Sequence, residues 1–296
     1  MPNAYFLSFD LLMLVLLALC ARHAWQAGGA ARLWQLLAGV IFGLLLEWAT
    51  IQQLHAYSYG RFALMLGGEV PVAIGIGWGV IIYSVRLFSD AAAMPGWARP
   101  MLDGLLALNI DLAMDAIAIR LGFWDWGQGM NYEYFGVPYP NFWAWFWVVF
   151  SFSVGMRWLT RSGSWSSAWV GPLGAIVVGV VGVLATNRLI TAGVPDGMQS
   201  EVVWGTLLVA LFLVRAVRPR LNRTELPALV FWVPFAIHVY YLAAGLLSGV
   251  FAPAPFLLLV SLAMLALALW LHGPTLRRMM GENASQADAV TAPPHG

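Results

Sequence analysis

Two aspartates lie four residues apart in an otherwise apolar stretch of the chain. Asp111 and Asp115 occur in NIDLAMDAIAIRLGFWDWG, residues 109–127. In a helix, positions i and i+4 share one face. Two carboxyl groups so placed away from water cannot both ionise cheaply, so one is expected to keep its proton near neutral pH. A protonated carboxyl group is what a general acid requires, and both aspartates are therefore candidate catalytic residues.

A third acidic residue, Glu47, lies inside another apolar stretch, LLLEW at residues 44–48. An acidic side chain near the bilayer centre costs about 2.5–3.5 kcal/mol on insertion scales, so such residues usually face a protein interior and mark a working site. If both stretches are helices that run toward the same membrane surface, Glu47 and Asp115 lie at similar depths. We expect the three carboxyl groups to converge on one interior cavity, with Tyr59 at its mouth.

The segment that follows the aspartates, residues 122–145, contains no basic residue and many aromatic ones. Aromatic faces attract cations, and the attraction grows when water is excluded. A protonated acid, a carboxylate partner and aromatic walls are together suited to making a carbocation from an alkene and holding it. The aromatic candidates for contact with such a substrate are Trp124, Trp126, Tyr134 and Trp145, together with Tyr59.

Each of these residues also has a structural interpretation. Trp and Tyr near a helix end commonly form an interfacial belt. The two aspartates could pair with Arg120 or cap neighbouring helices. His238, in the middle of an apolar run, fits an interhelical hydrogen bond as well as a substrate contact.

The elements that must position these residues are membrane-spanning helices. Of the 296 residues 61% are hydrophobic and 10% charged, with a mean hydropathy of +0.77, far from the composition of soluble domains. Apolar runs long enough to cross a hydrocarbon core recur nine times, and the count is uncertain by one. The runs cover about residues 5–21, 33–54, 69–88, 100–121, 140–160, 168–191, 200–217, 226–248 and 252–271. This pattern predicts an all-α, polytopic helical bundle.

The basic residues predict the orientation of the bundle. All fifteen are arginines, and with the N-terminus outside, twelve fall on the inner side and only Arg61, Arg120 and Arg188 outside. Cytoplasmic loops are enriched in basic residues, so we expect the N-terminus outside and the C-terminus in the cytoplasm. The membrane we expect is a bacterial inner membrane. In this orientation Asp115 lies about 6 Å nearer the outer surface than Asp111.

The domain organisation is simple. Residues 1–280 are expected to form one transmembrane domain, and the polar residues 281–296 a disordered tail, because they cannot bury enough apolar area to fold. The single cysteine and the scattered histidines show no metal-ligand spacing, and no phosphate-binding or nucleophile motif is present. We therefore expect no metal and no nucleic-acid partner. The sequence leaves the oligomeric state open.

An ordered set of motifs gives a family resemblance. LLLEW, YSYGRF, GGEVPVAIGIGWGVIIY, DLAMDAIAIRLGFWDWG and YEYFGVPYPNFWAW, within about residues 40–150, resemble the membrane-embedded carotenoid biosynthesis family that includes the CruF-type carotenoid 1,2-hydratases. The resemblance implies a hydro-lyase that adds water across the terminal C1=C2 double bond of an acyclic carotene, without a cofactor. Matching by motif carries over Glu47, Asp111, Asp115, Trp124, Trp126, Asn141 and Trp145 as candidate site residues.

The substrate expected from the residues and the resemblance is a carotene or another long isoprenoid hydrocarbon taken up from the lipid bilayer. Two alternatives remain open at this point. An isoprenoid cyclase begins with the same protonation, but a second alkene attacks the cation. A non-catalytic lipid binder or proton-coupled transporter would also place carboxylates inside the membrane.

Overall fold

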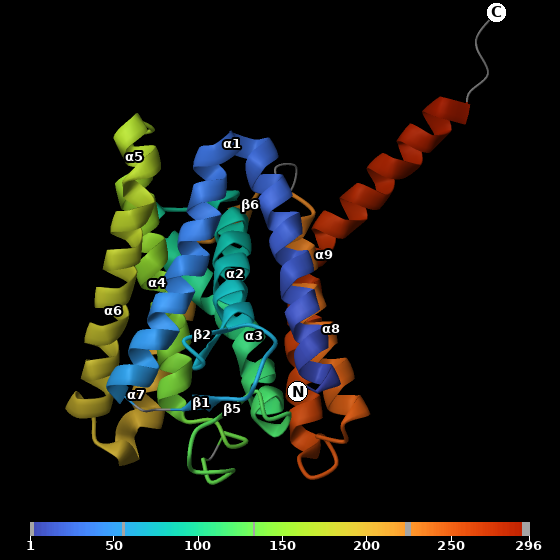
Figure 1. Cartoon of the computed structure of the whole chain (residues 1–296). Coiled ribbons are helices and arrows are strands. Elements are labelled where there is room, and N and C mark those ends of the chain that lie inside the picture. The colour runs from blue at the N-terminus through green and yellow to red at the C-terminus, as the bar shows by residue number, and fades with distance from the viewer. Residues whose placement is uncertain (1–2, 55–56, 133, 223–225, 292–296) are drawn as a thin grey trace, which may run out of the picture.

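The computed structural model describes residues 3–54, 57–132, 134–222 and 226–291, most of which are helical. Long helices lie side by side along a common direction (Figure 1). In chain order they are α1 (Ala4–Leu54), α2 (Val72–Asp90), α3 (Arg99–Arg120), α4 (Tyr139–Thr160), the short α5 (Trp165–Trp169), α6 (Gly171–Gly193), α7 (Gln199–Ala216), α8 (Leu229–Leu247) and α9 (Pro255–Thr291). Two 3₁₀ turns, η1 (Gly96–Ala98) and η2 (Asp196–Met198), precede α3 and α7. The predicted all-α class is confirmed.

Helix α1 consists of two arms that fold back on each other (Figure 1). The arms meet at Gly28 and Gly29, whose backbone angles are not helical. Gly29 has a φ of 59°, in the left-handed region that residues with a Cβ rarely adopt, so a glycine suits this bend. When the two arms are counted separately, each of the nine predicted apolar runs overlaps one helix or arm among the described residues.

The chain is an integral membrane protein. Among the described residues six helices, with α1 counted once, are long and apolar enough to cross a membrane: α1, α2, α6, α7, α8 and α9. The peripheral helices expose large apolar side chains, including Phe212 on α7 and Trp270 on α9. Exposed apolar surface on helices that satisfy their own backbone hydrogen bonds is what a lipid environment requires. The inner-membrane location and the orientation of the termini stay predictions.

Helix α3 occupies the middle of the bundle and carries the two aspartates. It packs against α2, α4, α7, α8 and α9. Small buried side chains, among them Ala113, Ala116 and Ala118, let these neighbours approach closely. The helix ends in a Schellman motif: Gly122 has a φ of 77°, and the Phe123 amide donates to the Ala118 carbonyl at 2.9 Å. This ending turns the chain sharply, just before Trp124.

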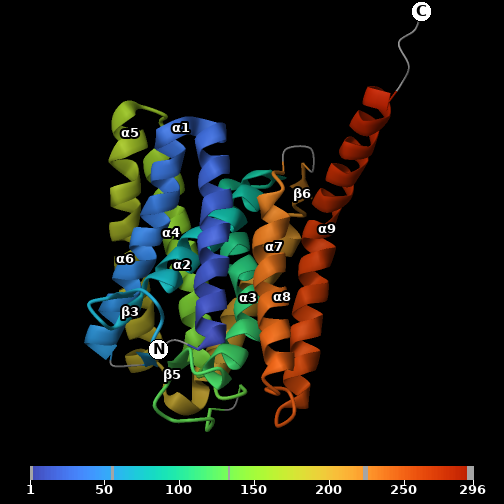
Figure 2. The ribbon, with the colours of Figure 1, turned by 45° about the vertical axis from the view of Figure 1, so that its right-hand side comes forward.

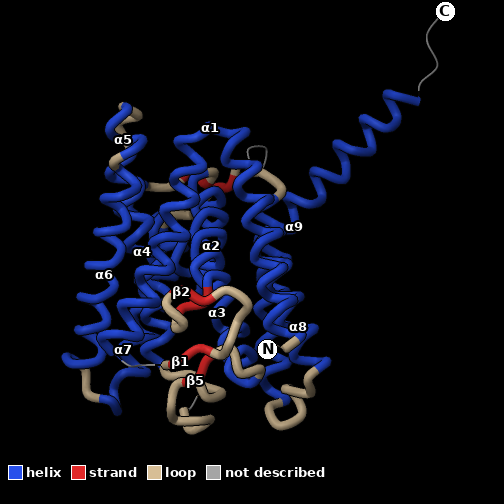
Figure 3. Tube along the Cα trace, viewed as in Figure 1, coloured by secondary structure: helices blue, strands red, loops and turns tan. Residues whose placement is uncertain are grey.

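Three short antiparallel ladders tie the loops together at the two ends of the bundle (Figure 3). Strand β1 (Ser58–Tyr59) pairs with β5 (Trp124–Asp125), and Tyr59 lies opposite Trp124. Strand β2 (Met65–Leu66) pairs with β3 (Val70–Pro71), and β4 (Ala92–Ala93) pairs with β6 (Arg220–Leu221) at the opposite end. The ladder of β1 and β5 therefore holds the loop after α1 against the loop after α3.

The C-terminal part of α9 leaves the bundle and projects away from it in both views (Figures 1 and 2). The helix extends to Thr291, so residues 281–291 are drawn as helix where the sequence predicts a disordered tail. Residues 292–296 lie outside the described residues. The disorder of residues 281–296 stays a prediction.

Candidate active site

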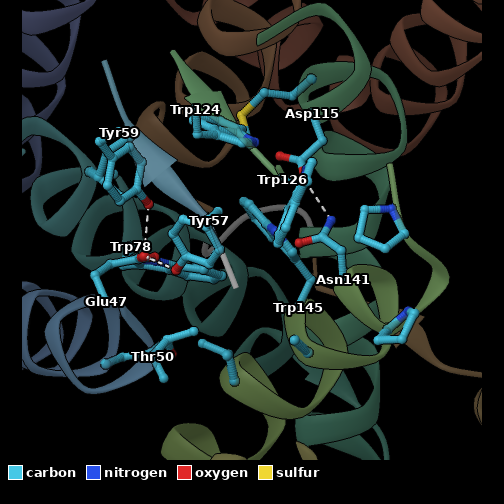
Figure 4. Close-up of a pocket in the computed structure, with 18 of the residues that line it drawn as sticks. Glu47, Thr50, Tyr57, Tyr59, Trp78, Asp115, Trp124, Trp126, Asn141 and Trp145 are labelled. Carbon is cyan, nitrogen blue, oxygen red and sulfur yellow. Dashed lines mark hydrogen bonds between the residues drawn. The ribbon is translucent and has the colours of Figure 1, made fainter. Parts of the chain in front are cut away.

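A cavity of about 310 Å³ lies among α1, α2, α3, α4, α6 and α8, beside the ladder of β1 and β5. Most of its wall is apolar or aromatic, and a few polar side chains point into it (Figure 4). The sequence-predicted residues that line it are Glu47, Tyr59, Asp115, Trp124, Trp126, Asn141 and Trp145. An apolar pocket with a few convergent polar groups is the usual form of a small-molecule site.

Asp111 and Asp115 share one face of α3 and are both buried. Their carboxyl groups lie within hydrogen-bonding reach of each other. The Asn141 side-chain amide donates to Asp115 Oδ2 at 2.6 Å and more weakly to Asp111, at 3.4 and 3.5 Å to its two oxygens. Asp111 does not line the cavity, so it reaches the cavity only through Asp115 and Asn141.

The start of α4 fixes the position of Asn141. Pro138 precedes the helix and Pro140 occupies its first turn, where a missing amide hydrogen costs nothing. The backbone amide of Asn141 donates to the Pro138 carbonyl at 2.9 Å. The side chain of Asn141 is therefore free to face α3 and to bridge the two carboxyl groups.

One oxygen of Asp115 remains without a hydrogen-bond partner. Asp115 Oδ1 is buried and has no partner in the described part of the chain. The alternative that Arg120 pairs with the aspartates finds no support, because Arg120 Nη1 donates to the carbonyls of Ala116 at 2.8 Å and Phe135 at 2.6 Å. Asp115 thus presents one held oxygen and one unpartnered oxygen beside the cavity.

Glu47 lies in the second arm of α1, and three neutral donors hold its carboxyl group. Tyr57 and Tyr59 donate to Oε2, the latter at 2.7 Å, and Trp78 Nε1 donates to Oε1 at 2.7 Å. Burial and the neighbouring Glu47 carboxylate raise the pKa of Tyr57 well above its usual range, so its hydroxyl stays a donor. Three donors stabilise the ionised form of a carboxyl group.

Aromatic rings surround the acidic groups. Trp78 and Trp145 pack with ring centroids 4.3 Å apart, and Trp126 meets Tyr57 at 4.8 Å. Trp124 lies edge-on to Tyr59 at 6.0 Å, as the pairing of β1 with β5 requires. These indole and phenol faces provide negative potential where a positive charge could form.

Two predicted residues lie away from the cavity. The Tyr134 hydroxyl donates to the Leu112 carbonyl of α3 at 2.9 Å, and the Tyr134 ring packs on Phe142 of α4. His238 faces Asn109, with 3.1 Å between His238 Nε2 and Asn109 Oδ1, which is the interhelical hydrogen bond that its sequence position also allowed. Neither residue is among those that line the cavity.

Sequence reasoning did not select Tyr57, Trp78 and Tyr241, all of which line the cavity. The stretch HAYSYGRF places Tyr57 at the mouth of the site together with Tyr59, but only Tyr59 was predicted as a site residue. Trp78 stands among glycines in GIGWGV, where a single large donor is conspicuous. Tyr241 lies in an apolar run that gives no comparable signal.

The described residues contain no group of three His, Cys, Asp or Glu side chains that could hold a metal ion. The described residues that line the cavity include no arginine, and their side chains that could act on a substrate are carboxyl, amide, hydroxyl and aromatic groups.

Comparison with known proteins identifies the family. Residues 8–212 match the model of the carotenoid biosynthesis protein family. No curated protein sequence and no solved structure matches the chain. The matched residues include Glu47, Asp111, Asp115 and the aromatic segment 122–145. They make up more than half of the 296 residues. The chain therefore belongs to the carotenoid biosynthesis protein family.

Proposed function

We propose that the protein is a hydro-lyase that adds water across the terminal C1=C2 double bond of an acyclic carotene. The observation that carries this proposal is the geometry of Asp115. One of its oxygens is held by Asn141, and the other is buried beside an aromatic cavity without a partner in the described residues. A carboxyl group so placed suits the delivery of a proton to a substrate that offers no hydrogen-bonding group of its own.

The proposed reaction begins with proton transfer from Asp115 to C2 of the alkene. The pair of π electrons forms the new C–H bond and leaves a tertiary cation at C1. A water molecule then forms a bond to C1, and a carboxylate of the site accepts the proton that this water loses. Asp111 shares the proton of the pair before the reaction, because two contacting carboxyl groups away from water do not both ionise cheaply.

Glu47 and the aromatic rings stabilise the cation in this proposal. In this proposal Glu47 acts as a carboxylate, and its three hydrogen-bond donors offset part of the cost of burying that charge; the faces of Trp124, Trp126 and Trp145 surround the same space. Groups that are already oriented toward the developing charge need no reorganisation during the reaction, which is the main source of electrostatic catalysis.

The cavity suits the end of a long hydrocarbon. Its volume of about 310 Å³ is at the lower end for small-molecule pockets, so it accommodates one end of a carotene and not the whole chain. The rest of the substrate would lie in the bilayer, between helices that expose apolar side chains. We place the protein in a bacterial inner membrane, with the cavity in the outer half, because the arginine distribution favours that orientation.

Expression of the chain in a bacterium that accumulates an acyclic carotene tests the proposal. Mass analysis of the pigments should show a product heavier than the substrate by one water molecule. A new pigment of unchanged mass would contradict hydration and indicate cyclisation after the same protonation. Unchanged pigment, with the protein inserted in the membrane, would contradict both reactions and favour a lipid binder or transporter.

A further inference from the structure

Four buried polar atoms in residues that line the cavity have no hydrogen-bond partner within the described ranges. They are Asp115 Oδ1, Trp126 Nε1, Asn187 Oδ1 and the Tyr241 hydroxyl. A buried polar group without a partner costs about 1–3 kcal/mol, and native proteins contain few of them. A polar cavity with room for water can satisfy such groups through bound water molecules.

Tyr241 differs from the other tyrosines near the site. Its side chain is only 2% exposed, and its ring is fixed among Phe9, Phe123 and Tyr240. The neighbouring Tyr240 donates to the Tyr5 carbonyl at 2.5 Å, so its hydroxyl has a structural partner. The Tyr241 hydroxyl has none in the described part of the chain, although buried tyrosine hydroxyls usually find one.

The groups around Glu47, on the other side of the cavity, are less suited to binding a water molecule. Tyr57 and Tyr59 both donate to Glu47, and Trp78 occupies the second Glu47 oxygen. A water molecule bound there would share the Glu47 carboxyl group with three donors that already hold it. Tyr241 and Asp115, in contrast, both line the cavity, and each has a buried oxygen without a partner in the described residues.

We infer that the Tyr241 hydroxyl and Asp115 Oδ1 together bind the water molecule that attacks the cation. This inference rests on the proposed hydration. After Asp115 has given its proton to C2, it is a carboxylate beside the bound water. The water oxygen forms the bond to C1, and the water proton passes to Asp115, which restores the acid. Tyr241 keeps its own proton and orients the water oxygen toward C1.

The inference adds α8 to the site. The family match ends at residue 212, whereas Tyr241 lies on α8, beyond it. The proton donor, Asp115, lies within the residues that match the family. The hydroxyl that orients the water, that of Tyr241, lies in the part of the chain that follows them. Protonation and water capture should therefore be separable by mutation.

The experiment compares wild type, Tyr241→Phe and Tyr240→Phe in membranes that contain the acyclic carotene, in ²H₂O. Protonation followed by loss of a proton leaves deuterium in the recovered carotene, and water capture gives the hydrated product. For Tyr241→Phe we expect the hydrated product per inserted molecule to fall about tenfold, the equivalent of one hydrogen bond. Deuterium in the recovered carotene should be retained or rise. Tyr240→Phe removes the same atom and should keep the wild-type ratio of the two products.

Two results would overturn the inference while hydration stands. Either Tyr241→Phe forms the hydrated product as fast as wild type, or it loses deuterium exchange and hydration in equal proportion. The second result would assign Tyr241 to protonation or to folding. If the wild type gives neither deuterium exchange nor hydrated product, the proposed hydration itself is refuted, and the water site with it.

Discussion

Helix α3 carries buried carboxyl groups near its start and in its second half, and within the described residues only Asp103, near the start, forms a salt bridge. Near the bend of α1, Asp103 accepts hydrogen bonds from the Ser89 hydroxyl and from Arg157 Nη1, both at 2.5 Å. Arg157 also binds Asp90 at 3.0 Å. Asp111 and Asp115 lie further along the same helix, and among the described residues no salt bridge involves them.

The difference shows which carboxyl groups can take part in proton transfer. Arg157 neutralises Asp103 permanently, because separating a buried ion pair leaves an uncompensated charge. Asp111 and Asp115 have only a neutral amide, Asn141, and each other. Keeping one proton on such a pair removes one of its two buried negative charges. In the proposed reaction, that proton passes to the substrate. We therefore assign a structural role to the carboxylate that Arg157 pairs, and propose the carboxyl groups without a salt bridge in the described residues as the candidate site.

The largest expected effect separates these two groups of carboxylates. Asp115→Asn and Asp111→Asn keep the side-chain shape but cannot deliver a proton, so pigment conversion per membrane-inserted molecule should fall about 10²–10⁴-fold. Asp103→Asn, the matched control on the same helix, should lower the yield of folded protein and leave conversion per folded molecule unchanged. Near-wild-type conversion by both Asp115→Asn and Asp111→Asn would end the acid-catalysis hypothesis.

The next effect tests the structural end of the comparison. Arg157→Met leaves Asp103 buried without its cation, and we expect a loss of about 3–5 kcal/mol in the free energy of unfolding. Thermal unfolding in detergent measures it. The control is Arg161→Met at the end of the same helix, because Arg161 is exposed and forms no salt bridge within the described residues. An Arg157→Met protein as stable as that control would contradict the structural assignment.

The smallest effect concerns the aromatic side chains that line the cavity, which we propose to stabilise the cation. Trp124→Ala removes a face worth about 2 kcal/mol to a desolvated cation, which corresponds to about 30-fold in conversion. Trp124→Phe keeps a weaker face and should cost less. Trp165→Ala, which removes an indole that is 76% exposed on α5, is the control and should leave conversion unchanged. Equal losses for the Phe and Ala variants would show that Trp124 contributes shape and not charge stabilisation.

The hydropathy and the spacing of residues along the chain were enough to predict the helices and part of the candidate site. The apolar runs predict the spans, because a helix is the simplest way to satisfy backbone groups in lipid. The spacing of Asp111 and Asp115 places both on one face of α3, whatever surrounds that helix. Glu47 and Trp124 reach the same cavity, as the cost of exposing an acid to lipid and the aromatic content of the loop indicated.

Tertiary structure decided which atoms are free to act. A helical period tells which residues share a face but not how the helix is rotated against its neighbours. The rotation of α8 turned His238 toward Asn109 and brought Tyr241 to the cavity, whereas the path of the loop after α3 turned Tyr134 toward Phe142. The packing of loops and helices also gave Glu47 three donors and left Asp115 Oδ1 with none in the described chain. These contacts join residues far apart in sequence, so they depend on side-chain packing among several helices, which no local pattern of residues encodes.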